Sequence, residues 1–354
     1  MKQDLFSEIQ LGELALSNRI VMAPMTRNRA PNGIPTALMG EYYAQRATAG
    51  LIITEGAQIS PQGVGYPATP GIYNDEQVSA WQQVIDDIHT AGGAVFVQLW
   101  HCGRISHPSF HDGALPVAPS AVQPAGQAVT YAGMQDFVTP RALAIEELAN
   151  IVEQYRHAAE MAIKAGFDGV EIHSANGYLL DQFLRDGSNR RTDSYGGSIE
   201  HRVRLLIEVT TAVCNAIGAN KVGVRISPVN AFNDMQDSDP QALFNHVASA
   251  LSALSPAYLH VVEVTMAGAI DTEVDMAQLR HHFDGRYIAN GGYDRARGNS
   301  VIATEAADMV AYGVPFLANP DLPNRLKQET KLNTPDQATF YGGDAHGYTD
   351  YPFA

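Results

Sequence analysis

Eight short β-rich runs, each followed by an amphipathic stretch, are the feature of this 354-residue chain that most restricts its fold. We expect strands at residues 19–25, 51–59, 94–100, 169–175, 221–228, 258–264, 286–292 and 308–312. Helical patterns, with apolar residues at steps of three and four, lie between them at 75–91, 145–165, 199–217, 240–254 and 296–307. Strands that alternate with helices predict a parallel sheet, and eight strands close such a sheet into a barrel. The predicted fold is therefore α/β, a (β/α)8 TIM barrel.

Two segments lie outside this alternation. The first eighteen residues alternate like a small hairpin, which we expect to close the bottom of the barrel. Residues 104–140, between the third and fourth predicted strands, are rich in Pro, Gly and Ser. Loops of this length in compact domains usually have a function, so we predict a cap over the barrel mouth. With no linker or internal repeat in the sequence, residues 1–354 are expected to form a single domain.

The composition excludes several classes of protein. Lys and Arg number 23 against 38 Asp and Glu, and the net charge of −15 argues against nucleic acid or an anionic membrane as the main partner. Cys102 and Cys214 are too few for a disulfide framework, a four-cysteine zinc site or a four-cysteine iron–sulfur cluster. There is no membrane-length apolar run and no signal-peptide core. We expect a cytoplasmic monomer or homodimer that acts on small molecules.

Polar side chains gather where the predicted strands end. In a barrel of this kind the chemistry belongs at the carboxyl ends of the strands. Gln98, His173 and Arg225 lie there, and each is costly to bury without a partner. Helix capping accounts for Thr26 or Ser227 alone, but not for those three together. The pattern favours a functional site at this rim.

The fourth strand carries the most informative group. Alternation places Glu171 and His173 on one face, and the turn that follows brings Asn176 beside His173. Two such groups make a clamp for negative charge that develops on a substrate oxygen. Tyr178, two residues further on, has a phenol that can deliver a proton. A lone histidine is more often structural, but the trio at a strand end favours catalysis.

Gln98 and Arg225 suit a flat heterocycle. Gln98 offers a donor and an acceptor, and Arg225 a permanent cation. An amide–imide edge that becomes anionic on reduction, as in an isoalloxazine ring, matches both. Gly291, Gly292 and Gly313 fall where barrel proteins commonly bind a phosphate through backbone N–H groups.

Several motifs are missing. The sequence has no G-x-G-x-x-G opening a helix and no P-loop. Of its five lysines only Lys221 adjoins a strand, and it lies at the wrong end for a Schiff-base aldolase. The histidines near Cys102 (His101, His107 and His111) lack a recognised ligand spacing, so no metal is predicted.

Two runs carry a family resemblance. Residues 173–183 (HSANGYLLDQF) and 189–198 (NRRTDSYGGS) resemble the Old Yellow Enzyme family of flavin-dependent ene-reductases, most closely its classical branch. Further matches, which extend the resemblance over the whole chain, are 23–27 (APMTR), 98–101 (QLWH), 318–322 (ANPDL) and 346–352 (HGYTDYP).

The resemblance implies non-covalent FMN at the barrel mouth. The cofactor contacts it implies come from Pro24, Met25, Thr26, Ala57, Gln98, Arg225, Gly291, Gly292, Gly313 and Val314. His173 and Asn176 would hold the oxygen of a substrate or of a phenolic ligand, and Tyr178 would donate the proton. Tyr66, Trp100 and Tyr348 would line the substrate side.

The implied reaction is ping-pong hydride transfer. NAD(P)H reduces the flavin and leaves, and an activated alkene then takes its place. The acceptors expected are α,β-unsaturated carbonyls, nitro compounds or nitrate esters. Such a reaction needs no separate dinucleotide-binding domain, which agrees with the missing glycine fingerprint.

One position departs from the family pattern. After the eighth strand the family has Gly-Arg, and the arginine binds the FMN phosphate, whereas this chain has Gly313-Val314. Loss of such a contact costs about 1.5–3 kcal/mol, or roughly ten- to a hundredfold in affinity. We expect Arg295 or Arg297, at the start of the helix after the seventh strand, to replace it in part.

Two other functions are weighed against this one. A relative of the dienoyl-CoA reductases would need more cysteines than two for its iron–sulfur cluster. A barrel that binds flavin or phenolic ligands without turnover is a different class, and the sequence leaves it open.

Overall fold

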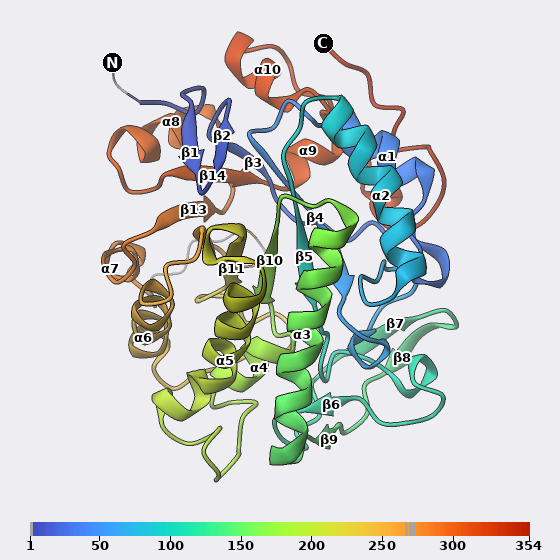
Figure 1. The fold of residues 1–354 in the computed structure, drawn as a ribbon, viewed down its shortest axis with the longest axis vertical. Coiled ribbons are helices and arrows are strands. Elements are labelled where there is room, and N and C mark those ends of the chain that lie inside the picture. The colour runs from blue at the N-terminus through green and yellow to red at the C-terminus, as the bar shows by residue number, and fades with distance from the viewer. Residues whose placement is uncertain (1–2, 266–267, 269–272) are drawn as a thin grey trace.

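The computed structural model describes residues 3–265, 268 and 273–354, and within them eight parallel strands close into a barrel (Figure 1). The barrel strands are β3 (Ile20–Met22), β4 (Leu51–Gln58), β5 (Val95–Trp100), β10 (Gly169–Ser174), β11 (Val222–Ile226), β12 (Tyr258–Val262), β13 (Arg286–Asn290) and β14 (Met309–Tyr312). They are joined in the order β10-β11-β12-β13-β14-β3-β4-β5. The predicted TIM barrel is confirmed. The first strand ends earlier than expected, at Met22, close to Pro24, whose nitrogen has no hydrogen for a ladder bond.

Helices surround the barrel and bury one face against it (Figure 1). They are α1 (Ala37–Ala44), α2 (Asp75–Thr90), α3 (Ile145–Ala165), α4 (Leu179–Leu184), α5 (Ile199–Ile217), α6 (Pro240–Ser252), α7 (Met276–His281), α8 (Arg295–Ala303), α9 (Val314–Ala318) and α10 (Leu322–Gln328). In α3 the buried face includes Leu148, Ile151 and Tyr155, as the apolar spacing predicts. Side-chain caps set several starts; for example, the Asn74 side chain accepts from the Gln77 N–H at the start of α2.

The N-terminal hairpin closes one end of the barrel. Strands β1 (Ile9–Leu11) and β2 (Leu14–Leu16) pair antiparallel. Leu11 and Leu16 belong to a buried cluster with Phe96, Tyr258 and Met309 from the barrel strands. The hairpin therefore seals the amino end of the barrel with apolar contacts, as expected.

The long insertion after β5 lies at the other end (Figure 1). It contains the antiparallel pair β7 (Gln127–Thr130) and β8 (Gly133–Asp136), and the two short strands β6 (Val117–Ala118) and β9 (Arg141–Ala142). Its buried residues Ile105, Ala128 and Phe137 share one cluster with Trp100 and Tyr178 at the barrel mouth. This cap helps to build the wall of the mouth.

Membrane-spanning character was assessed over the described residues. None of their helices combines the length and the apolar character that crossing a bilayer requires.

Candidate active site

The strand register brings the predicted polar residues to neighbouring places inside the barrel. Glu171 pairs with Gln98 across β10 and β5, His173 pairs with Arg225 across β10 and β11, and Arg225 pairs with His260 across β11 and β12. All five residues are buried. Alternate residues of a barrel strand point inward and stack in layers, so this register assembles one polar group toward the carboxyl end.

Glu171 is the centre of this group. Its carboxylate accepts a hydrogen bond from Gln98 Nε2 at 2.8 Å and one from His260 Nδ1 at 2.8 Å. Burial by itself raises the pKa of the Glu171 carboxyl, but His260, Arg225 and Gln98 together bring that pKa below its ordinary value. Glu171 is therefore an ionised carboxylate in the barrel interior.

The two basic side chains beside Glu171, those of His260 and Arg225, differ in charge. Burial and Arg225 lower the pKa of His260 more than Glu171 raises it, so His260 is a neutral imidazole that donates through Nδ1. Arg225 keeps its charge and donates from Nη2 to Asn290 Oδ1 at 3.2 Å. Its buried Nε has no hydrogen-bond partner among the described residues. A buried cation with a free donor is suited to an acceptor supplied by a ligand.

Aromatic rings form the wall above this group. Trp100 stacks near His173 with ring centroids 6.1 Å apart, and Tyr178 meets both rings edge-on, at 4.9 Å from Trp100 and 5.1 Å from His173. The hydroxyl groups of Tyr66 and Tyr178 are 3.1 Å apart. A Cβ at Gly56 would lie 2.5 Å from the indole ring, so only glycine there leaves room for Trp100. The structure thus brings Tyr66, Trp100, His173 and Tyr178 together.

His173 and Tyr178, two of the titratable groups of this wall, are neutral. Burial, with Arg225 and His260 nearby, holds the pKa of His173 well below its ordinary value. Burial, together with Tyr66 and Cys102, raises the pKa of Tyr178 well above its ordinary value. His173 therefore offers one N–H to a substrate, and Tyr178 keeps its proton until an acceptor forms.

Asn176 lies in the turn that leaves β10. Its φ of 57° is left-handed, a conformation that asparagine adopts more readily than most residues. Its backbone N–H donates to Ser227 Oγ at 2.7 Å, and its carbonyl accepts from Asn233 Nδ2 at 2.8 Å. Asn233 also opposes the rise in the pKa of Tyr178, and so it lies near two of the predicted catalytic residues, Asn176 and Tyr178. Asn233 has no motif of its own in the sequence, and only the fold reveals its place.

The other predicted cofactor residues all adjoin carboxyl ends of barrel strands. Pro24, Met25 and Thr26 follow β3, and Ala57 is in β4. Gly291 and Gly292 follow β13, while Gly313 and Val314 follow β14. Gly292 has a φ of 61°, and a Cβ on Gly313 would lie 3.5 Å from Met25 Sδ. With the unpartnered Arg225 Nε, this set fits a flat, hydrogen-bonding ring with an anionic tail.

Tyr348 lies elsewhere than the resemblance implies. It is fully buried, stacks on Tyr42 with ring centroids 4.0 Å apart, and lies beneath the guanidinium groups of Arg27 and Arg29. It belongs to the main core, whereas Tyr66, Trp100 and Tyr178 share a different cluster. The expectation that Tyr348 lines the substrate side is therefore wrong: the residue is a core anchor of the C-terminal tail.

A different tail tyrosine lies near the mouth. Tyr341 is 69% exposed, and it contributes to the raised pKa of Tyr66, which comes mainly from burial. A tail without periodicity does not show which of its tyrosines approaches Tyr66, so nothing in the sequence singles out Tyr341.

The two arginines proposed to replace the missing phosphate ligand differ in their partners. Arg295 forms an ion pair with Glu329 at 2.9 Å, so its charge is already engaged. Arg297 donates to the carbonyl of Gly292 at 2.8 Å and lies over the ring of Tyr293. Only Arg297 is held against the glycine turn at the strand end.

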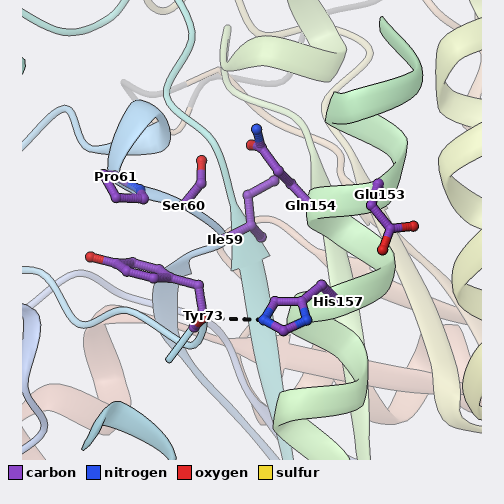
Figure 2. A pocket seen from close by; sticks show the side chains of 7 residues that line it. All are labelled: Ile59, Ser60, Pro61, Tyr73, Glu153, Gln154 and His157. Carbon is purple, nitrogen blue, oxygen red and sulfur yellow. Dashed lines mark hydrogen bonds between the residues drawn. The ribbon is translucent and has the colours of Figure 1, made fainter. Parts of the chain in front are cut away.

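Figure 2 shows a separate hollow on the outside of the barrel, between α3 and the segments that follow β4. Its lining includes Ser60, Glu153 and His157, and His157 contacts the carbonyl of Tyr73. It contains none of the predicted site residues. Over the described residues, no group of three or more His, Cys, Asp or Glu side chains is arranged to hold a metal ion.

Comparison with known proteins agrees with this geometry. Residues 4–333 match the model of the NADH:flavin oxidoreductase / NADH oxidase family. A 12-oxophytodienoate reductase 1 of Oryza sativa subsp. japonica is 45% identical over 359 residues, which cover 99% of this chain and 93% of that protein.

Solved structures give the same result. Morphinone reductase in complex with tetrahydroNAD has a TM-score of 0.95 at 45% identity, covering 99% of this chain and 98% of the other. The Old Yellow Enzyme homologue from Zymomonas mobilis has a TM-score of 0.96 at 42% identity, covering 99% of each chain.

The barrel and its site thus define a flavin-dependent oxidoreductase. The chain belongs to the Old Yellow Enzyme family. It is an FMN enzyme that takes electrons from a reduced nicotinamide nucleotide and passes them to activated alkenes.

Proposed function

We propose that this chain is a single-domain cytoplasmic ene-reductase for α,β-unsaturated carbonyl compounds, with NADPH or NADH as reductant. The observation that carries the proposal is the group of neutral His173, Asn176 and proton-bearing Tyr178 beside the polar set of Gln98 and Arg225. The cytoplasmic assignment is supported by two cysteines that are free thiols.

His173 and Asn176 bind the carbonyl oxygen of the substrate. An N–H from each side chain donates to this oxygen, and both hydrogen bonds strengthen as negative charge moves onto it. Because His173 is neutral, it stabilises the developing negative charge by a hydrogen bond and not by a full positive charge. The same two donors bind a phenolic ligand through its oxygen.

Tyr178 delivers the proton to the α-carbon. Its buried phenol has a raised pKa, so it is fully protonated at neutral pH. Tyr66, whose hydroxyl is 3.1 Å away, receives or supplies a hydrogen bond as the Tyr178 proton leaves and returns. Trp100 and Tyr66 form the apolar wall that positions the alkene and excludes water.

Bound FMN supplies the hydride-transfer chemistry. Thr26, Gln98 and Arg225 would hold the ring, with the backbone of Pro24, Met25 and Ala57 alongside. Arg225 would stabilise negative charge on the ring, and the neighbouring Glu171 carboxylate would limit how strongly it does so. Gly291, Gly292, Gly313 and Val314 would surround the phosphate, and Arg297 would supply the cation that the chain lacks at Val314.

The experiment that tests this proposal is Tyr178→Phe in the FMN-loaded enzyme. Loss of the proton donor should slow reoxidation by 2-cyclohexenone by about 10²–10⁴-fold, whereas reduction by NADPH changes by less than about threefold. Stopped-flow absorbance of the flavin measures the two half-reactions separately. Equal slowing of both would remove Tyr178 from the role of acid.

The same measurement separates an enzyme from a binding protein. If NADPH bleaches the flavin and the enone restores its colour in the unmodified protein, the chain turns over. Retained colour after addition of NADPH would favour the flavin-binding alternative instead.

A further inference from the structure

The orientation of the Asn176 amide decides whether it attracts or repels a substrate oxygen. An asparagine side chain is a donor through Nδ2 and an acceptor through Oδ1, and the two ends are nearly equal in shape. Only Nδ2 can donate to a carbonyl or phenolate oxygen. A residue that fixes the amide would therefore act directly on substrate binding.

Asn230 contacts this amide from the loop after β11. Its Nδ2 donates to Asn176 Oδ1 at 2.9 Å, and its own Oδ1 accepts the backbone N–H of Phe232 at 3.1 Å. Asn230 is 1% exposed, so water does not compete for these bonds.

The backbone fixes the direction of this chain of hydrogen bonds. The N–H of Phe232 is a donor in every state, so the end of the Asn230 amide that faces it is the oxygen. The nitrogen of Asn230 therefore faces Asn176, and the oxygen of Asn176 faces Asn230. The Nδ2 of Asn176 is left over, and it makes no hydrogen bond within the described residues, where Asn176 is only partly buried.

We propose that Asn230 is a positioning residue that holds the Asn176 amide with its donor toward the substrate. This inference rests on the proposed function, in which Asn176 binds the substrate oxygen. Ser227 and Asn233 cannot replace Asn230, because they bond only the backbone of Asn176 and leave its amide free to turn.

Asn230→Asp is the sharpest test, because it keeps the shape of the side chain but replaces the donor that faces Asn176 with an acceptor. The introduced carboxylate still accepts from the Phe232 N–H, but it has no hydrogen to donate to Asn176. The Asn176 amide then turns its Nδ2 toward the carboxylate and its Oδ1 toward the substrate. We expect the dissociation constant of 4-chlorophenol, titrated spectrophotometrically on the FMN-loaded enzyme, to rise roughly 30-fold.

Asn230→Ala is the matched control. It removes the lock without imposing the opposite orientation, so the dissociation constant should rise only about three- to fivefold. With 2-cyclohexenone, Asn230→Asp should raise KM and lower kcat, since the donor acts both on binding and on the developing charge. An equal or smaller loss of phenol affinity for Asn230→Asp than for Asn230→Ala would overturn the proposal.

A double-mutant cycle separates positioning from a general structural or charge effect. In the Asn176→Ala background there is no amide to orient, so Asn230→Asp should change phenol affinity by less than about threefold. The same loss in both backgrounds would overturn the proposal. If Asn230→Asp does not fold, Asn230→Ala in both backgrounds decides the question, and its three- to fivefold effect must vanish without Asn176.

The cycle also distinguishes failure of this inference from failure of the proposed function. If Asn176→Ala alone leaves phenol affinity unchanged, the role of Asn176 is refuted, and the role of Asn230 falls with it. If Asn176→Ala weakens binding and neither Asn230 variant does, only the positioning role is refuted.

Discussion

Two carboxylates on barrel strands, Glu171 in β10 and Glu55 in β4, are equally buried but differ in charge. The pKa of Glu171 is below its ordinary value, whereas burial raises the pKa of Glu55 to about 7. Burial alone therefore does not set the state of a carboxylate in this protein. The difference comes from the hydrogen-bond donors that surround each carboxylate.

The donors around Glu171 are side chains that point at it, Gln98 and His260, with the cation of Arg225 nearby. Glu55 has the backbone N–H of Arg27 at 3.2 Å and the hydroxyl of Tyr43 at 3.3 Å. The guanidinium of Arg27 is directed elsewhere, to the carbonyl groups of Phe340 and Gly347 in the C-terminal tail. Glu55 therefore receives no hydrogen bond from the Arg27 guanidinium, and burial dominates its pKa.

The largest expected effect is that of Glu171→Gln. Removing the anion leaves the buried Arg225 without its compensating charge, so the free energy of unfolding at pH 7 should fall by about 3–5 kcal/mol. Urea unfolding of the FMN-loaded protein, followed by circular dichroism, measures it.

The pH dependence gives the check on this variant. The pKa of Glu171 is lowered by folding, so its stabilisation is present above the unfolded pKa and is lost as the pH falls through the folded pKa. The difference between unmodified protein and Glu171→Gln should persist from pH 8 to pH 5 and shrink below it. A difference under about 1 kcal/mol at pH 7 would show that Glu171 is not ionised.

The second largest effect is that of Glu55→Gln. The pH dependence of stability that Glu55 causes is opposite in sign to that of Glu171. The pKa of Glu55 is raised by folding to about 7, so the folded state binds the extra proton and loses stability as the pH rises toward 7. The unmodified protein should lose about 2 kcal/mol between pH 5 and pH 7 through this group. Glu55→Gln should lack that slope in urea unfolding at the two pH values. If Glu55→Gln loses the same stability between pH 5 and pH 7, other groups cause the pH dependence.

The smallest effect is that of Tyr43→Phe. The Tyr43 hydroxyl donates to Glu55 Oε1, and one hydrogen bond is worth about 0.5–1.5 kcal/mol. Its loss should move the titration midpoint of Glu55 upward by roughly half to one pKa unit, read from the pH dependence of unfolding. Tyr155→Phe is the control, because its buried hydroxyl has no hydrogen-bond partner among the described residues. If Tyr155→Phe shifts the midpoint by a similar amount, the shift does not come from loss of the Tyr43–Glu55 hydrogen bond.

The sequence predicts the barrel and much of its polar rim, since both depend on local patterns. Apolar runs mark the strands, and Gln98, His173 and Arg225 stand out because they end such runs. Strand register then forces these residues together, whatever the loops do.

Other features depend on contacts between distant segments and leave no local trace. The ion pair of Arg295 with Glu329 joins α8 to the residue that follows α10, and the stacking of Tyr348 on Tyr42 joins the tail to α1. Asn230 and Asn233 lie in a loop without periodicity, so their hold on Asn176 emerges only in three dimensions. The place of Tyr348 in the core likewise depends on its contacts with Tyr42, Arg27 and Arg29, which the tail sequence does not show.

The insertion between β5 and α3 has a consequence for engineering substrate scope. Ala128 and Phe137 within it pack against the same cluster as Trp100 and Tyr178, while the solvent-facing Tyr131 and Met134 lie at or beside its β-turn. A chimera that grafts a relative's hairpin should therefore transplant only the turn and its outward residues, and retain the two inward anchors. Such a chimera would change the entrance to the site without disturbing Trp100 and Tyr178 beneath it.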